Sequence, residues 1–85
     1  MSQLLENKVC IITGAAQGIG RQIANQFAAD GAIVYVCDRQ EFTSENDNIH
    51  PIVMDITDAT SVKTAFMQIF KTEGRIDCLV NNAGI

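Results

Sequence analysis

The sequence has few basic residues, no long apolar run and no internal repeat. Its 85 residues include six Lys and Arg, placed singly, against ten Asp and Glu, which gives a net charge of −4. So little positive charge argues against nucleic acid or an anionic membrane as a partner. The longest apolar runs, such as residues 32–37, fall far short of the roughly 18 residues that a membrane span needs. The first residues, MSQLLENK, also lack the basic and apolar regions of a signal peptide.

Cysteine and histidine are also sparse. The three cysteines, Cys10, Cys37 and Cys78, each lie in a separate apolar run. Because this spacing matches no metal site or redox motif, we expect buried, reduced thiols and no metal ion. Reduced thiols and the missing signal peptide predict a cytoplasmic protein. The single histidine, His50, is expected to be a solvated loop residue.

Apolar residues form four strand-like runs. The composition, 47% hydrophobic and 19% charged, is that of a globular core, and the length allows at most one small domain. Continuous β-branched runs predict buried strands over residues 9–13 and 33–37. Shorter apolar runs predict a third strand over 51–54 and a fourth centred on Leu79 and Val80. The polar stretch between 39 and 50 predicts a loop or at most one helical turn.

Two stretches have a helical period instead. The first covers residues 18–29, and Gly31 is a natural stop for it. The second begins after a predicted N-cap at Asp58 and ends at Gly74. Strands and helices in this order predict an α/β fold with a doubly wound parallel sheet in the order 3-2-1-4. Residues 1–85 would then be the N-terminal part of one such domain, with its ligand crevice at the carboxyl ends of strands 1 and 4.

A glycine-rich segment, TGAAQGIG, joins the first strand to the first helix. Gly14 stands where the turn is tightest, Gly18 would let a diphosphate approach the backbone, and Gly20 would let the helix lie close to the strand. Free N–H groups and the helix dipole favour an anion at this turn. The alternative is that the three glycines only serve packing.

Asp38 makes the ligand interpretation stronger. It follows the second strand at an offset where a carboxylate reaches the ribose of a bound dinucleotide. A 2′-phosphate there would be repelled, so Asp38 favours NAD, with NADP the less favoured cofactor. Arg39 is expected to stay solvated or to pack on the adenine. Asp38 alone could also be an ordinary turn residue.

Three motifs in this order give the sequence a family resemblance. TGAAQGIG after the first strand, Asp55 after the third and NNAG after the fourth resemble the short-chain dehydrogenase/reductase family, over residues 8–85. The resemblance implies a Rossmann-like fold, similar to 3-oxoacyl-carrier-protein reductases and to related NAD-dependent alcohol and dihydrodiol dehydrogenases. The segment between the second and third strands is shorter than in many relatives, so one face of the sheet would be covered by the first helix alone.

The resemblance also implies which residues line the dinucleotide. Asp55 would bond the adenine amino group with Ile56 against the ring, Asn81 would tie down the neighbouring turn, and the neutral Gln17 again favours NAD. The full set implied to bind the cofactor is Gly14, Ala16, Gln17, Gly18, Ile19, Gly20, Asp38, Asp55, Ile56, Asn82, Ala83 and Gly84.

The catalytic groups of the family are a Tyr, a Lys four residues after it, a Ser and a further Asn, and all lie beyond residue 85 of such a sequence. The only tyrosine, Tyr35, has no Lys four residues on and is expected to pack in the core or beside the cofactor. We therefore expect an NAD(P)-dependent oxidoreductase for small alcohols or ketones, present here as its cofactor-binding half and inactive alone. The open apolar edge of the fourth strand predicts a marginal or self-associating chain. The alternative function is a non-enzymatic module that docks on a full-length relative.

Overall fold

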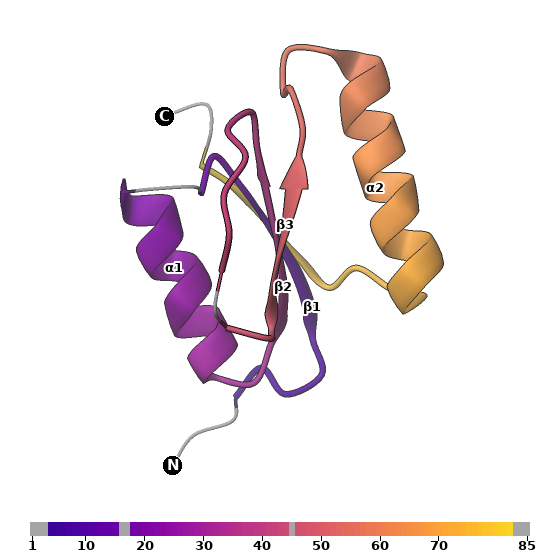
Figure 1. Ribbon diagram of the computed structural model, residues 1–85. Coiled ribbons are helices and arrows are strands. Elements are labelled where there is room, and N and C mark those ends of the chain that lie inside the picture. Colours follow the sequence, from indigo (N-terminus) through magenta and orange to yellow (C-terminus); the bar gives the residue numbers. More distant parts are fainter. Residues whose placement is uncertain (1–3, 16–17, 45, 83–85) are drawn as a thin grey trace.

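The apolar runs of the sequence become the strands of one parallel sheet. The computed structural model describes residues 4–15, 18–44 and 46–82, and Figure 1 shows their arrangement. The sheet has the order β3-β2-β1-β4, and every neighbouring pair is parallel. This confirms the predicted α/β class and strand order. The elements are β1 (Val9–Thr13), α1 (Gly18–Ala29), β2 (Ile33–Asp38), β3 (Ile49–Val53), α2 (Ala59–Glu73) and β4 (Cys78–Asn81).

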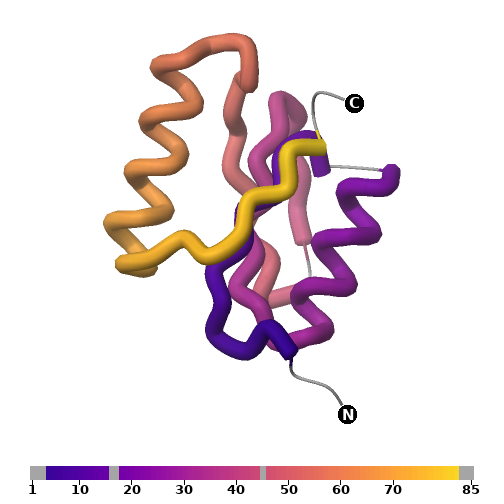
Figure 2. The backbone as a smooth tube through the Cα atoms, turned by 180° about the vertical axis from the view of Figure 1, so that it is seen from behind, coloured from indigo at the N-terminus to yellow at the C-terminus, as the bar shows by residue number. Residues whose placement is uncertain are grey.

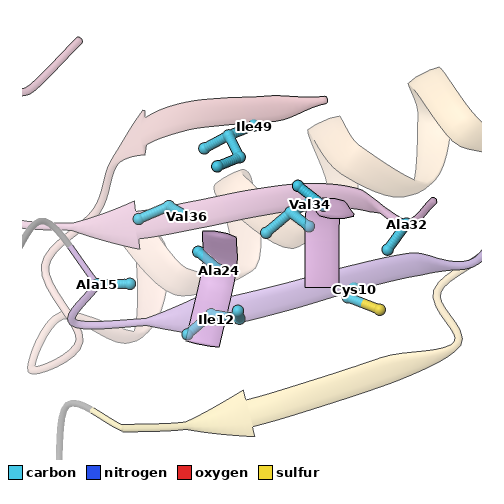
Figure 3. Close-up of a cluster of buried hydrophobic side chains, with 9 residues drawn as sticks. Cys10, Ile12, Ala15, Ala24, Ala32, Val34, Val36 and Ile49 are labelled. Carbon is cyan, nitrogen blue, oxygen red and sulfur yellow. The ribbon is translucent and has the colours of Figure 1, made fainter. Parts of the chain in front are cut away.

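The two helices cover opposite faces of the sheet (Figure 1). Successive side chains of a strand point to opposite faces, so β1 and β2 each supply both cores. Ile12 and Val36 pack beneath α1, together with Ala24 of that helix, as Figure 3 shows. Ile11 and Tyr35 belong to the cluster beneath α2. Both central strands are buried on both faces, as their continuous apolar runs predict.

Local signals fix the helix ends. The side chain of Asp58 accepts hydrogen bonds from the backbone N–H groups of Thr60 and Ser61, which confirms the predicted N-cap of α2. Gly74 closes α2 in the left-handed conformation, with φ of 80°. Gly31 follows α1 with φ of 93°, so both predicted helix stops are confirmed.

The third strand differs from its prediction. β3 begins at Ile49 rather than at position 51, so His50 lies in a strand and not in a solvated loop. Its ring lies 5.0 Å from the ring of Tyr35 on the neighbouring strand. The backbone of Met54 bonds to β2, and because strand bonding alternates, the nitrogen of Pro51 points away from β2. The proline therefore costs the sheet no hydrogen bond.

The segment between β2 and β3 contributes to the core, although it forms no helix. Phe42 is half-buried and packs against the cluster beneath α1, and the Arg21 guanidinium lies 5.1 Å from its ring centroid. The prediction that the first helix alone covers this face is therefore wrong. The prediction of three buried thiols holds for Cys10 and Cys37, whereas Cys78 is only half-buried.

Candidate functional site

The carboxyl ends of the first three strands surround a cleft of about 260 Å³. The residues that form it come from the ends of β1 and β2 and from the turn after β3. This is the carboxyl end of the sheet, as predicted, but the cleft lies over β1, β2 and the turn after β3, whereas the sequence predicted a crevice at strands 1 and 4. Three of the predicted site residues, Gly14, Asp38 and Ile56, meet in this cleft. Its lining is Thr13, Gly14, Cys37, Asp38, Arg39, Met54, Ile56 and Thr57.

The glycine turn begins in a conformation that favours glycine. Gly14 has φ of 66°, and its N–H donates to the carbonyl of Cys37 at 2.8 Å, which holds the turn against the end of β2. Gly18, the first residue of α1, has φ of 70°, and a Cβ there would meet no atom within 4 Å. The backbone at Gly18 is therefore open to a ligand. The neighbouring predicted residues Ala16 and Gln17 lie outside the described residues.

Gly20 serves close packing, as the sequence predicts. A Cβ on Gly20 would lie 2.7 Å from Nδ2 of Asn82 and 2.9 Å from both the Cα of Ala15 and the carbonyl oxygen of Gly14. No side chain larger than hydrogen fits there without moving the backbone. The same Asn82 Nδ2 donates to the Gly14 carbonyl at 3.0 Å. The helix start, the turn and the end of β4 therefore form one tight contact.

Thr13 joins the ends of β1 and β4 beside this contact. Its hydroxyl donates to Oδ1 of Asn81 at 3.1 Å and accepts from the backbone N–H of Asn82, also at 3.1 Å. Asn81 is thus bonded to the last residue of β1, immediately before the glycine turn that it was predicted to tie down. Ala83 and Gly84, the rest of the predicted motif, lie outside the described residues. Thr13 opens the glycine-rich segment but was not among the predicted site residues, although its place at a strand end marks it.

Asp38 ends β2 at the edge of the cleft. Its Oδ1 accepts from the N–H of Gln40 at 2.9 Å, which orients the carboxylate. Asp38 is half-buried, whereas Arg39 is exposed and lines the same cleft. The cleft is thus lined by one acidic and one basic residue from consecutive positions of the chain.

The turn after β3 carries Asp55 and Ile56. Asp55 Oδ1 accepts from the hydroxyl of Thr57 at 2.6 Å and from its N–H at 2.9 Å, and these bonds lower the pKa of the Asp55 carboxyl. The nearby charge of Arg39 lowers this pKa further. The carboxyl group is therefore ionised at neutral pH. Ile56 is 41% exposed although it is apolar, and it faces the cleft.

The cleft also contains residues that the spacing of the sequence motifs did not reveal. Cys37 and Met54 are buried side chains at its base, and burial raises the pKa of the Cys37 thiol to about 11. Cys37 and Met54 are the last residues of two predicted strands. The reasoning that selected Asp38 from its place at a strand end therefore applies to them as well. The predicted Ile19 is 72% exposed on the first turn of α1.

Tyr35 lies away from the cleft, in the core beneath α2. Its hydroxyl donates to Oε2 of Glu73 at 2.5 Å, and burial together with this bond raises its pKa to about 12. Of its two predicted positions, the core is therefore the right one. Among the described residues, no group of three or more His, Cys, Asp or Glu side chains is arranged to hold a metal ion.

A second hollow lies on the outer side of α2. It measures about 760 Å³, is lined chiefly by apolar side chains and includes Met67, Phe70 and Ile76, which are 61%, 56% and 37% exposed. Leu79 of β4 is 53% exposed as well. No helix in the described part of the chain is long and apolar enough to cross a membrane.

Comparison with known proteins gives one family. The model of the short-chain dehydrogenase family matches residues 8–85. The 3-oxoacyl-[acyl-carrier-protein] reductase of Thermotoga maritima is 39% identical over 90 residues, which cover 95% of this chain and 37% of that protein. Dehydrogenase/reductase SDR family member 1 of Mus musculus is also 39% identical, over 93% of this chain and 28% of its own length. The chain thus spans about a third of the length of these curated relatives.

Solved structures give the same result. The ligand-free aldohexose dehydrogenase of Thermoplasma acidophilum has a TM-score of 0.87 and 36% identity, over 96% of this chain and 31% of its own. The 3-ketoacyl-(acyl-carrier-protein) reductase of Brucella melitensis, solved as a complex with NADH, has a TM-score of 0.81 and 33% identity, over 88% of this chain and 33% of that one.

Proposed function

This chain belongs to the short-chain dehydrogenase/reductase family, and we propose that it is the NAD-binding N-terminal part of an oxidoreductase acting on an alcohol or ketone. The observation that carries the proposal is the cleft in which Gly14, Asp38 and Ile56 meet. These residues come from three separate strand ends and supply a glycine turn, a carboxylate and an apolar wall. A dinucleotide needs these three features for its diphosphate, its ribose and its base.

The glycine turn suits the diphosphate. Gly18 opens α1 with space where a side chain would stand, so a phosphate can reach the backbone N–H groups at the helix start. The helix dipole adds about 0.3–1 kcal/mol for an anion at such a terminus. Ile19 follows on the same exposed turn. We assign Gly14, Ala16, Gln17, Gly18, Ile19 and Gly20 to the segment that surrounds the diphosphate.

The carboxylate of Asp38 favours NAD over NADP. Its ionised oxygens can accept from ribose hydroxyls, and they would repel a 2′-phosphate at the same place. Gln17 supplies no positive charge that would offset this repulsion. Arg39 lines the same cleft, so removal of Asp38 would make the charge there more positive. Cofactor choice in this chain therefore depends on the balance between these two neighbours.

The adenine would lie against Ile56. This side chain is 41% exposed at the cleft, and a flat base would cover it. Asp55 is held by Thr57 through one carboxylate oxygen, so its other oxygen would take the amino group of the base. We assign the ribose on the other side to Asn82, Ala83 and Gly84, with Asn82 also bracing the glycine turn.

The nicotinamide, when bound, accepts or supplies the hydride. We assign no catalytic acid or base to this chain, because Tyr35 is buried in the core and its hydroxyl donates to Glu73. The chain is expected to bind NAD in the cytoplasm as one part of a single domain, and to turn over no small alcohol or ketone by itself. It spans 37% and 28% of the two curated relatives above, so the groups that act on the substrate are assigned to the remaining length.

The test measures NADH and NADPH binding by nicotinamide fluorescence. We expect the chain to bind NADH at least tenfold more tightly, a difference of about 1.4 kcal/mol. Asp38→Ser should weaken NADH binding and strengthen NADPH binding, because the carboxylate that repels a 2′-phosphate is removed while Arg39 remains in the cleft. Glu41→Gln, an exposed acid in the same segment, is the matched control and should leave the preference unchanged. Tighter binding of NADPH by the unaltered chain would overturn the assignment of Asp38.

The exposed apolar surface of α2 and β4 favours a second function, that of a non-enzymatic module. Phe70 and Leu79 are more than half exposed, which is unusual for large apolar residues that serve no contact. Association with a second copy or with a full-length relative through β4 would cover them. Sedimentation of the purified chain tests this function. A stable monomer at micromolar concentration contradicts it, and the NADH measurement is unaffected by that outcome.

A further inference from the structure

Cys10 and Cys78 occupy paired positions on adjacent strands. Cys10 of β1 is the register partner of Cys78, the first residue of β4. Neighbouring strands lie about 4.8 Å apart, and disulfides form between Cα atoms about 4.4–6.8 Å apart. The two residues are therefore within reach of each other without a change in sheet register, although most of the chain, residues 11–77, separates them in sequence.

The two thiols also lie on the same face of the sheet. Cys10 belongs to the buried cluster beneath α1, and Cys78 packs against that cluster. Because Cys10 and Cys78 are register partners on parallel strands, their side chains project from this face side by side. In Figure 3 the sulfur of Cys10 points toward the side of β1 on which β4 lies. The third cysteine, Cys37, packs beneath α2 on the opposite face.

The two thiols differ in their access to solvent. Cys10 is fully buried, and desolvation, followed by the effect of Cys78, raises its pKa to about 11. Cys78 is half-buried at the outer strand of the described sheet, which Figure 2 shows next to β1. A dissolved oxidant therefore reaches Cys78 first, with Cys10 already placed behind it.

We propose that Cys10 and Cys78 form a reversible disulfide that ties β4 to β1, with hydrogen peroxide or a peroxide of the same class as oxidant. The Cys78 thiolate attacks one peroxide oxygen, so an S–O bond forms, the O–O bond breaks and hydroxide leaves. The Cys10 sulfur then attacks the Cys78 sulfenic acid, the S–S bond forms, and the hydroxyl leaves as water with the Cys10 proton. Two thiols are oxidised by two electrons, and one peroxide is reduced to two waters. Thiol–disulfide exchange with glutathione reduces the disulfide to the two thiols again.

The test maps which cysteines join. The chain, shown to be folded by circular dichroism, is treated with hydrogen peroxide, alkylated and digested with trypsin. We expect one linked pair of peptides, containing Cys10 and Cys78, with a mass lower by two hydrogen atoms than the sum of the reduced peptides. Glutathione should remove it. The same treatment in concentrated guanidinium chloride should instead favour Cys10 with Cys37, because loop closure favours the pair that is nearer in sequence.

Matched variants separate this site from ordinary thiol oxidation. Cys37→Ala should keep the linked pair, whereas Cys78→Ala should lose it. Oxidation should raise the midpoint of thermal unfolding of the unaltered chain and of Cys37→Ala, and leave that of Cys78→Ala unchanged. The proposal is overturned if folded chains link Cys37, if Cys78 joins a second molecule, or if Cys10 remains a free thiol after peroxide treatment.

Discussion

The two helices meet the sheet in different ways. α1 presents small residues to the strands, with Gly20, Ala24 and Ala28 buried, and it lies close to β1 and β2. α2 approaches with larger side chains, buries Ala65 and Ile69, and stands further from the sheet in Figure 1. Close approach on the α1 side brings the helix start to the glycine turn. Looser packing on the α2 side leaves Phe70 and its neighbours exposed.

The difference shows that the two faces of the sheet depend on different kinds of packing. The face beneath α1 is dictated by close approach, because the small buried residues of α1 let its backbone lie near the strands. The face beneath α2 is dictated by apolar volume, where several residues of similar size would serve equally well. Substitutions on the two faces should therefore have different costs.

The largest effect is expected from Gly20→Val. Its side chain would overlap Asn82, Ala15 and Gly14, and two of these contacts are with backbone atoms that cannot rotate away. We expect the free energy of unfolding to fall by about 4 kcal/mol, near the upper end for overpacking. Urea unfolding followed by circular dichroism measures it. Ala29→Val, at the exposed end of the same helix, is the control and should cost only about 0.5 kcal/mol of helix propensity.

The α2 face should respond to lost volume instead. Ile69→Ala removes a fully buried side chain and should lower the free energy of unfolding by about 3 kcal/mol through lost transfer energy and a cavity. Phe70→Ala, the next residue, removes a larger side chain that is 56% exposed and should cost about 0.5 kcal/mol or less. Equal costs in urea unfolding would mean that Phe70 is covered in solution by another molecule.

A smaller effect is expected at the start of α2. Asp58→Ala removes the acceptor for two backbone N–H groups and should lower the free energy of unfolding by about 1 kcal/mol. Asp47→Ala, an exposed acid outside the helices, should have no measurable effect. Because Asp58 itself does not line the cleft, NADH binding by Asp58→Ala should match that of the unaltered chain at a temperature where both are folded.

The smallest effect concerns pH. The hydrogen bond from Arg75 and then that from the N–H of Val9 lower the pKa of Asp77, which lies beside β1. A lowered folded pKa means that the carboxylate stabilises the fold above its unfolded pKa of about 3.9 and that this contribution is lost as the pH falls through the folded value. Asp77→Asn should therefore flatten the loss of stability below about pH 4, measured as urea midpoints against pH. An unchanged slope would contradict this account.

The central strands and both helices were predictable because each carries a complete local signal. β1 and β2 are buried on both faces, so their apolar runs are continuous, and Asp58 and Gly74 mark the ends of α2. β3 was predicted less well, because it is an outer strand with alternating burial and contains a proline. Its first residues therefore resemble a loop, and His50 was placed there wrongly.

The candidate site was predictable to the extent that it follows strand ends. Gly14, Asp38 and Ile56 were expected at one end of the sheet, and they line one cleft. The bond from Asn82 to Gly14 and the pairing of Cys10 with Cys78 depend on the register of β4 against β1. Register between distant segments is set by the packed sheet and by no local spacing, so these contacts required the structure.

The proline of β3 makes the two edge strands of the described sheet unequal in their capacity to pair with a further strand. The backbone nitrogen of Pro51 points away from the sheet and carries no hydrogen. A strand pairing with β3 would therefore lack one hydrogen-bond donor at the centre of this edge. β4 has no such interruption in its described residues. Addition of a fifth strand is thus favoured beside β4, next to the exposed side chain of Leu79.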